Sequence, residues 1–134
     1  MTVRQFLYCS VLAYMIHGIP LYAKPILTIT NQEQLQEQVG QHELVVVEFL
    51  MAGCTHCQRF ERAKTFAKLA DQFPTAQFVK IFFKNTQLIK QYNIRTFPSF
   101  IIFINGVLSS IRHAGFSSEQ NLKNKINQVM QSIN

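Results

Sequence analysis

Residues 44–50 read LVVVEFL, an apolar run interrupted only by Glu48, and the sequence CTHC begins at Cys54, four residues beyond its end. Continuous apolarity of this kind is typical of a β-strand buried on both faces of a sheet. Such a strand needs neighbouring strands and covering helices, so the run predicts an α/β domain. The chain can build that core, because 48% of its 134 residues are hydrophobic and only 15% are charged.

Turn and capping signals divide the rest of the chain into alternating elements. Strands are predicted at residues 26–29, 44–50, 77–83, 99–104 and 107–112. The last two are joined by Asn105-Gly106, a dipeptide that favours a tight hairpin. Helices are predicted from an N-cap at Thr30 to Gly40, from about Cys54 to Phe73, after an N-cap at Asn85, and after an N-cap at Ser117. This order, β-α-β-α-β-α-β-β-α, predicts a mixed central sheet of four to five strands flanked by helices on both faces.

The first 23 residues differ in character from the rest of the chain. They carry one charge, Arg4, followed by an apolar run at residues 6–16 and, after a break, the small residue Ala23. That layout is typical of a secretory signal peptide, so we predict a cleaved signal at residues 1–23 and one domain at residues 24–134. An uncut membrane anchor is the alternative, although the run is shorter than the roughly 20 residues that span a bilayer.

Cysteine usage supports export. Removal of the predicted signal takes away Cys9 and leaves one closely spaced pair, Cys54 and Cys57. The last four residues, QSIN, do not form an endoplasmic-reticulum retention signal, so a bacterial periplasm is the predicted location. The formal charge of +6 is spread along the chain, which is typical of a solvated surface, and we expect no nucleic-acid partner.

A CxxC pair has several chemical uses. A structural zinc site needs four ligands, and the further candidates, His42, His56 and His113, are scattered along the chain. Copper binding by the two cysteines and His56 is a similar alternative. A stabilising disulfide normally closes a long loop, whereas two intervening residues constrain very little. The spacing therefore favours a reversible, redox-active disulfide between Cys54 and Cys57, with no other cofactor.

The position of the pair assigns a role to each cysteine. Cys54 lies where a buried strand ends and a helix begins, and the partial positive charge of a helix N-terminus favours a thiolate. Cys54 is therefore the expected nucleophile, with a lowered pKa, and Cys57, one turn later, is the expected resolving thiol. A positive His56 would add to the stabilisation of the thiolate. The alternative for His56 is an exposed residue of the first turn with no role in the reaction.

Glu48 stands alone as a charged residue in an apolar strand, six positions before Cys54. A buried carboxylate is costly unless it is paired or functional. We therefore expect a raised pKa for Glu48 and a role in accepting the proton of Cys57 during exchange. Lys80 is a possible partner across the sheet, and a solvent-facing edge position is the alternative for Lys80.

Three segments together resemble the thioredoxin superfamily. They are VVVEFLMAGCTHCQRF, YNIRTFPSFIIFINGVL and the sequence AGF before the final helix, and the resemblance covers residues 26–134. It implies a thioredoxin-like fold and a cis peptide bond at Pro98, beside the CxxC pair. It also implies that the Phe97 backbone pairs with the bound substrate, and Thr55 and Pro98 are expected to contact it too. A trans Pro98 that only begins a strand is the alternative.

Some positions depart from the family pattern. Gly53 stands where tryptophan is usual, Thr55 replaces glycine or proline, and Arg62 replaces a common kinking proline, which predicts a straighter helix. In contrast, Glu48 and the histidine before the second cysteine resemble protein disulfide isomerase domains. His56 thus indicates an oxidant or isomerase, whereas the small size without an inserted domain indicates a reductase or a helper of cytochrome maturation.

The leading hypothesis is an enzyme, a monomeric thiol–disulfide oxidoreductase. Its expected partners are cysteine-containing exported proteins and an unidentified redox partner protein. A second hypothesis is a thioredoxin-like binding or chaperone module that uses the groove around Phe97, Pro98 and Gly115 without turnover. A third is a metal-binding chaperone.

Overall fold

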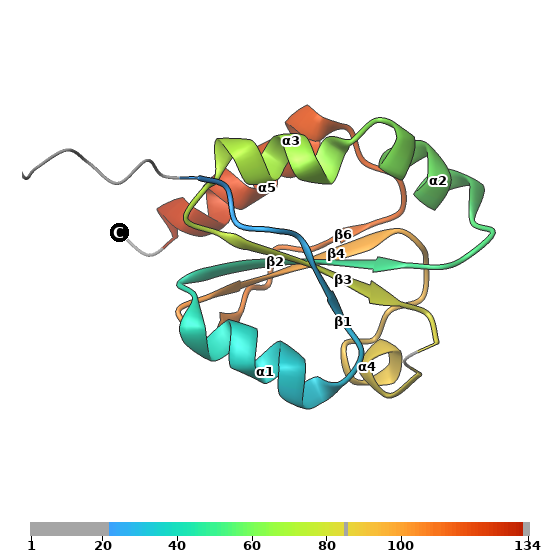
Figure 1. Ribbon diagram of the computed structural model, residues 1–134, viewed down its shortest axis with the longest axis horizontal. Helices are drawn as coiled ribbons and strands as arrows, with labels where there is room; N and C mark the ends of the chain where they lie inside the picture. Colours follow the sequence, from blue (N-terminus) through green and yellow to red (C-terminus); the bar gives the residue numbers. More distant parts are fainter. Residues whose placement is uncertain (1–21, 85, 133–134) are drawn as a thin grey trace, which may run out of the picture.

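Strand β2 (Leu44–Leu50) lies at the centre of the sheet in the computed structural model, which describes residues 22–84 and 86–132 (Figure 1). Its neighbours are β3 (Gln77–Phe82), which is parallel to it, and β4 (Ser99–Ile104), which is antiparallel. Every residue of β2 is buried, as its continuous apolarity predicts. The prediction of a mixed sheet is confirmed.

Among residues 22–84 and 86–132 the sheet has six strands, one more than the predicted maximum of five. β1 (Leu27–Ile29) pairs with β3 at one edge, and β5 (Val107–Leu108) follows the predicted Asn105-Gly106 hairpin at the other. The predicted strand at 107–112 is wrong beyond Leu108. There the Ser109 hydroxyl accepts a hydrogen bond from the backbone N–H two residues later and ends the pairing. A separate short strand, β6 (His113–Ala114), then pairs with the other end of β4.

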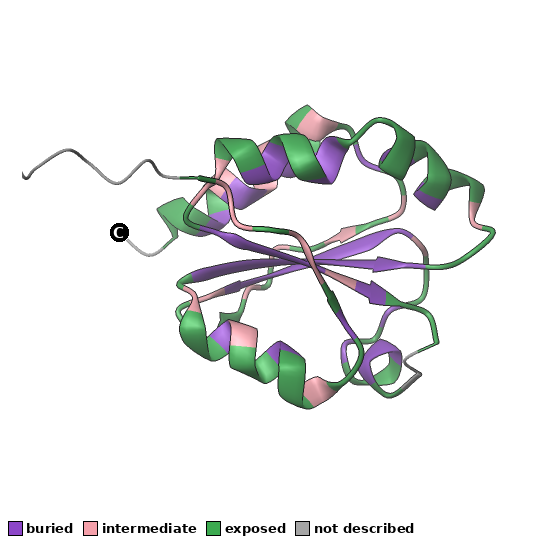
Figure 2. Ribbon diagram, viewed as in Figure 1, coloured by how far each residue is buried: buried purple, intermediate pink, exposed green. Residues whose placement is uncertain are grey.

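Helices cover both faces of the sheet, as predicted (Figure 1). One face carries α1 (Gln32–Gln41) and α4 (Thr86–Gln91). The opposite face carries α2 (Thr55–Arg62), α3 (Thr65–Gln72) and α5 (Glu119–Gln131). The burial pattern follows this arrangement, because the central strands β2, β3 and β4 are buried along most of their length and the helices are buried only where they face the sheet (Figure 2).

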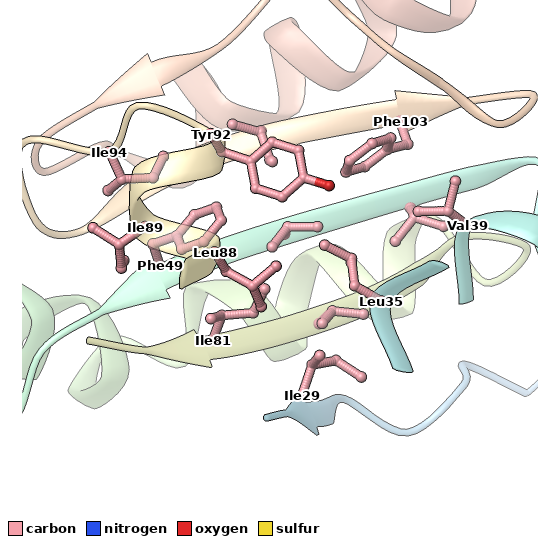
Figure 3. Close-up of a cluster of buried hydrophobic side chains, with 14 residues drawn as sticks. Ile29, Leu35, Val39, Phe49, Ile81, Leu88, Ile89, Tyr92, Ile94 and Phe103 are labelled. Atoms are coloured by element: carbon pink, nitrogen blue, oxygen red, sulfur yellow. The ribbon is translucent and has the colours of Figure 1, made fainter. Parts of the chain in front are cut away.

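Two apolar layers result from the alternation of side chains along the strands. Val45, Val47 and Phe49 of β2 point into the layer under α1 and α4, which is shown in Figure 3. Val46 points into the other layer, where buried phenylalanines from α2, α3, β3 and β4 meet. Glu48 lies on this second side of the sheet, because it is two residues beyond Val46. The strand therefore delivers a carboxyl group beneath α2.

The single helix predicted from about Cys54 to Phe73 is wrong. The chain forms α2 and α3, separated at Ala63 and Lys64, and Lys64 adopts a left-handed φ of 52°. The reason is geometric. Leu69 follows Phe60 by nine residues, which on a continuous helix of 3.6 residues per turn places the two side chains on opposite faces. The break allows both to be buried against the sheet. The straighter helix that Arg62 predicts is therefore also wrong.

Two predicted helix starts are displaced by one residue. Asn31, and not Thr30, caps α1, and Ser118, and not Ser117, caps α5. In each case a neighbouring side chain with the same capping chemistry accepts the bond from the first turn. The predicted cap Asn85 lies outside the described residues.

The predicted signal segment also lies outside the described residues, except for Tyr22 and Ala23. Its cleavage therefore stays a prediction. Within residues 22–84 and 86–132, no helix has the length and apolarity needed to cross a membrane.

Substitution of Phe66 on α3 tests the packing of the second apolar layer. Its buried ring lies 4.9 Å from that of Phe78 and 6.2 Å from those of Phe60 and Phe100, measured between centroids. Phe66→Ala should therefore lower the free energy of unfolding by about 3–5 kcal/mol, because it removes buried area and leaves a cavity. Urea unfolding measures this change. Val107→Ala is the control at an exposed position and should change it by less than about 0.5 kcal/mol. Equal effects of the two substitutions would contradict the packing described.

Candidate active site

Cys54 lies at the junction of β2 and α2, as the sequence predicts (Figure 1). The turn between them passes through Gly53, whose φ of +77° is a conformation that side-chain-bearing residues rarely adopt. Cys54 is the N-cap of α2, and its Sγ accepts a hydrogen bond from the backbone N–H of Cys57 at 3.2 Å. An N–H donor at a helix N-terminus stabilises negative charge on the atom that it faces. The structure thus places the half-exposed sulfur of Cys54 in a setting suited to a nucleophile.

Cys57 has a different environment on the same turn. Its side chain is only 2% exposed, and both cysteines are free thiols in the structure. Burial, followed by its hydrogen bond with Cys54, raises the pKa of the Cys57 thiol to about 12. Cys57 is therefore protonated at neutral pH and needs a proton acceptor before it can react. This difference between the two sulfurs agrees with the predicted order of nucleophile and resolving thiol.

The predicted substrate-contacting segment lies directly beside Cys54. The Phe97–Pro98 peptide bond is cis, as the resemblance implies, and the Cys54 S–H donates to the Phe97 carbonyl oxygen at 3.5 Å. The Pro98 carbonyl accepts a hydrogen bond of 2.8 Å from the Gly115 N–H, which ties this loop to the segment before α5. The structure therefore brings together residues that are more than 40 positions apart in the sequence.

Glu48 is fully buried on the sheet face under α2. Within the described residues, neither carboxyl oxygen of Glu48 has a hydrogen-bond donor. Burial, followed by the negative charge of the nearby Glu61, raises the pKa of Glu48 to about 8, and the positive charge of Lys80 opposes this shift. The predicted direction of this pKa shift is confirmed.

Lys80 is directly opposite Glu48 in the register of β2 and β3, yet it pairs elsewhere. Its Nζ lies 2.6 Å from Oε2 of Glu61 on α2. Sequence reasoning missed Glu61, although a signal was present. Glu61 follows Cys57 by four residues, which places the two on the same side of the helix.

Thr55 and His56 are exposed on the first turn of α2. The His56 ring lies 6.4 Å from the ring of Phe116, between centroids, and the Arg59 guanidinium lies 4.8 Å from the centroid of the same ring. His56 forms no hydrogen bond with either cysteine in the part of the chain that is described. Phe116 is a second residue that sequence reasoning missed as part of the site.

Two connected depressions open beside the cysteines. One, of about 480 Å³, is lined by Cys57, Glu61, Met51 and Phe82, among others. The next, of about 750 Å³, shares Met51 and Phe82 and continues to Phe83, whose ring packs edge-on against Phe97 at 5.4 Å between centroids. Phe82 and Phe83 are 40% and 45% exposed, so an apolar surface adjoins the reactive pair.

No three His, Cys, Asp or Glu side chains gather as metal ligands within residues 22–84 and 86–132. His42, one of the zinc-ligand candidates, accepts a hydrogen bond at Nδ1 from the Lys24 ammonium at 3.3 Å. His113 contacts the backbone carbonyl of Phe116 at 3.2 Å.

The comparisons with known proteins agree with this geometry. The thioredoxin family model matches residues 26–128. The chain is 35% identical over 83 residues to a thioredoxin of Mycoplasma genitalium, an alignment covering 61% of this chain and 79% of the relative. It is 26% identical over 110 residues to protein disulfide isomerase-like 1-1 of Arabidopsis thaliana, covering 78% of this chain but only 22% of the relative.

Solved structures show the same fold. A mutant thioredoxin from Halobacterium salinarum superimposes with a TM-score of 0.72 at 25% identity, covering 80% of this chain and 92% of that one. Thioredoxin from Trypanosoma brucei brucei gives a TM-score of 0.71 at 22% identity, covering 84% and 97%. The mixed sheet and the placement of its helices thus belong to a known architecture.

The raised pKa of Glu48 predicts a pH-dependent stability. Below its ordinary pKa of 4.5, Glu48 is protonated in both the folded and the unfolded protein. Between that value and about 8, only the unfolded protein ionises, so the free energy of unfolding falls as the pH rises. Relative to Glu48→Gln, which cannot ionise, the wild type should lose several kcal/mol over this range, at about 1.4 kcal/mol per pKa unit. Urea unfolding of both proteins from acidic to mildly alkaline pH measures the difference. Parallel pH profiles of the two proteins would show that Glu48 is not buried as described.

Proposed function

The chain belongs to the thioredoxin family, and we propose that it is a thiol–disulfide oxidoreductase that exchanges disulfides with exported proteins through Cys54 and Cys57. The observation that carries this proposal is the Cys57 N–H bond to Cys54 Sγ at 3.2 Å, formed at the N-terminus of α2. It gives a half-exposed sulfur a charge-stabilising donor and keeps the second, buried sulfur within reach.

The reaction begins at Cys54. Its thiolate attacks one sulfur of a substrate disulfide, forms a mixed disulfide, and releases the other substrate sulfur as a thiolate that takes a proton from solvent. Cys57 then transfers its proton to Glu48 and attacks the Cys54 sulfur. The Cys54–Cys57 disulfide forms, the mixed disulfide breaks, and the second substrate sulfur leaves. Two electrons pass from the pair to the substrate, and a redox partner protein must return them. The reverse sequence oxidises a substrate dithiol.

Glu48 suits this exchange because its pKa of about 8 lies close to neutral pH. It is ionised in a fraction of molecules and can accept the Cys57 proton, and in the reverse direction its acid form can return that proton. Each proton transfer occurs within the protein, because Glu48 and the Cys57 side chain on α2 are both buried.

The surface around Cys54 is suited to an extended substrate chain. Phe97 and Pro98 contribute a loop next to the sulfur, and the exposed Thr55 directly follows Cys54 in the chain. Gly53 has no side chain to cover this area, and Phe82 and Phe83 supply apolar contacts instead.

The export of this domain is supported by the sequence of residues 1–23. A positive start, an apolar middle and a small residue at the end fit a secretory signal. Its removal leaves two cysteines, both in the reactive pair. We therefore place the protein in an oxidising compartment, a bacterial periplasm, acting as a monomer.

A binding module without turnover is the second candidate function. It is favoured by the large exposed apolar side chains near the pair: Met51, Phe82, Phe83 and Phe116. Such side chains can hold an unfolded segment through apolar contact alone. The two candidates differ in whether the sulfurs are needed.

Substitution of each cysteine tests the proposal. Cys54→Ser should reduce insulin reduction to the rate of dithiothreitol alone, because no nucleophile remains. Cys57→Ser should instead accumulate mixed disulfides with substrate, visible on non-reducing gels and reversed by reductant. Cys9→Ser, assayed in the full-length chain that still carries residues 1–23, is the matched control for a cysteine outside the pair and should keep wild-type turnover. Turnover retained in Cys54→Ser would refute the mechanism. Full function of the Cys54/Cys57 double variant in cells would favour the binding module.

A further inference from the structure

Glu61 is a charged residue of the site to which the exchange mechanism assigns no role. It lies on α2 one turn after Cys57, and its side chain is 38% exposed. It lines the depression of about 480 Å³ together with Cys57. Glu61 therefore stands between solvent and the buried carboxyl of Glu48.

Lys80 has two carboxylates within its reach and contacts one. Its position opposite Glu48 in the β2–β3 register, with side chains on the same side of the sheet, would allow it to approach Glu48. Its ammonium instead lies 2.6 Å from Glu61, and its side chain is 18% exposed. Glu48 is left without a donor within the described residues.

The groups around Glu48 come from three elements. α2 contributes Glu61 and the Cys57 thiol, and β3 contributes Lys80. β4 contributes Phe100 opposite Glu48, which is apolar. The electrostatic potential at the Glu48 carboxyl therefore depends on which carboxylate pairs with the Lys80 ammonium.

We propose that Glu61 is a positioning residue that holds the Lys80 ammonium away from Glu48 and thereby controls when Glu48 binds the proton exchanged with Cys57. This inference rests on the proposed function, because it concerns the proton acceptor of that reaction. The negative charge of Glu61 also repels a negative charge on Glu48 directly. Both effects act in one direction, toward protonated Glu48, which agrees with the raised pKa of Glu48.

Glu61→Gln tests the effect of the Glu61 charge while the fold is retained. The substitution keeps the shape of a half-exposed side chain, removes the charge that holds Lys80, and frees the ammonium to approach Glu48. The midpoint of Glu48 titration, read from its side-chain carboxyl ¹³C shift in the fully reduced full-length protein, should fall by at least about one pH unit, a tenfold change in proton affinity. An unchanged midpoint would overturn the proposal.

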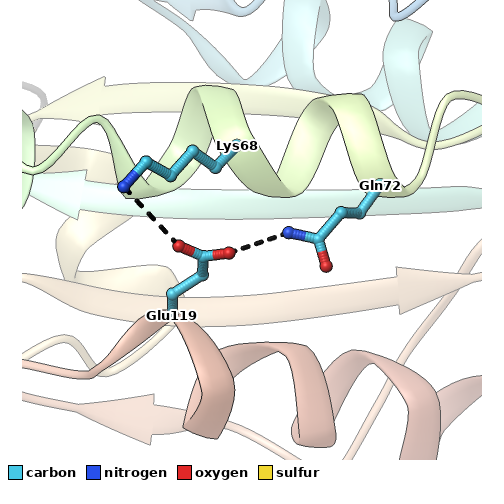
Figure 4. Close-up of polar contacts among 3 residues, drawn as sticks. All are labelled: Lys68, Gln72 and Glu119. Atoms are coloured by element: carbon cyan, nitrogen blue, oxygen red, sulfur yellow. Dashed lines mark hydrogen bonds and ion pairs between the residues drawn. The ribbon is translucent and has the colours of Figure 1, made fainter.

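Glu119→Gln is the matched control. Glu119 also pairs with a lysine, Lys68, at 3.8 Å, and accepts a hydrogen bond from Gln72 at 2.8 Å (Figure 4). Because this pair joins α3 and α5 away from the cysteines, its loss should leave the Glu48 midpoint in place. Glu61→Asp keeps the charge and should stay near the wild-type midpoint. A shift produced equally by all three substitutions would indicate a general loss of structure and would contradict the proposal.

A double-substitution cycle isolates the part that passes through Lys80. In a Lys80→Met background there is no ammonium to redirect, so Glu61→Gln should shift the Glu48 midpoint by less than half of its effect in the wild type. Equal shifts in the two backgrounds would overturn the positioning role and leave only direct repulsion between carboxylates.

The titration distinguishes this inference from the proposed function. It reports the proton on Glu48 whether or not disulfide exchange occurs, so an inactive wild type would refute the function and leave the positioning role testable. In an active protein, the pH profile of mixed-disulfide resolution should move in the same direction as the titration in Glu61→Gln.

Discussion

The pairing of β2 with strands on both sides is the constraint on which the rest of the structure depends. Because β3 and β4 flank it and helices cover both faces, β2 has a fixed register and a fixed end. The chain leaves that end through Gly53 and enters α2 at Cys54, so the reactive sulfur is held at a helix N-terminus by the core itself. β4 begins beside the same point and brings the Pro98 loop to Cys54. Sheet registration thus assembles the reactive centre from distant segments.

The same pairing creates the electrostatic problem at Glu48. Side-chain alternation along β2 directs this carboxyl into an apolar layer, where an ionised group is costly. The cost is tolerable only because Glu48 can remain protonated near neutral pH, and the same shift raises the proton affinity of Glu48 toward that of the neighbouring Cys57 thiol. Stability and reactivity are therefore linked at one residue. The burial that destabilises the ionised form of Glu48 also raises its proton affinity, which it needs to accept the proton of Cys57.

Much of the fold was predictable because its signals are local. The continuous apolarity of β2, the Asn105-Gly106 hairpin and the capping side chains of the helices each act within a few residues, and the CxxC position follows from them. The break between α2 and α3 was not predictable from the sequence, because it depends on where the sheet lies relative to Phe60 and Leu69. The choice of Lys80 between Glu48 and Glu61 likewise depends on how α2 sits above β3. These features arise from packing between elements, which sequence periodicity does not encode.

The most direct test of the central claim is the reduction potential of the Cys54–Cys57 pair. The full-length protein would be equilibrated with glutathione buffers of graded redox poise, and its free thiols would be quantified by alkylation. A helix-capping CxxC that works as a reversible centre predicts one two-electron transition between about −270 mV, typical of thioredoxin, and about −120 mV, typical of strong disulfide donors. A pair that could not be cycled between dithiol and disulfide under these buffers would contradict the account.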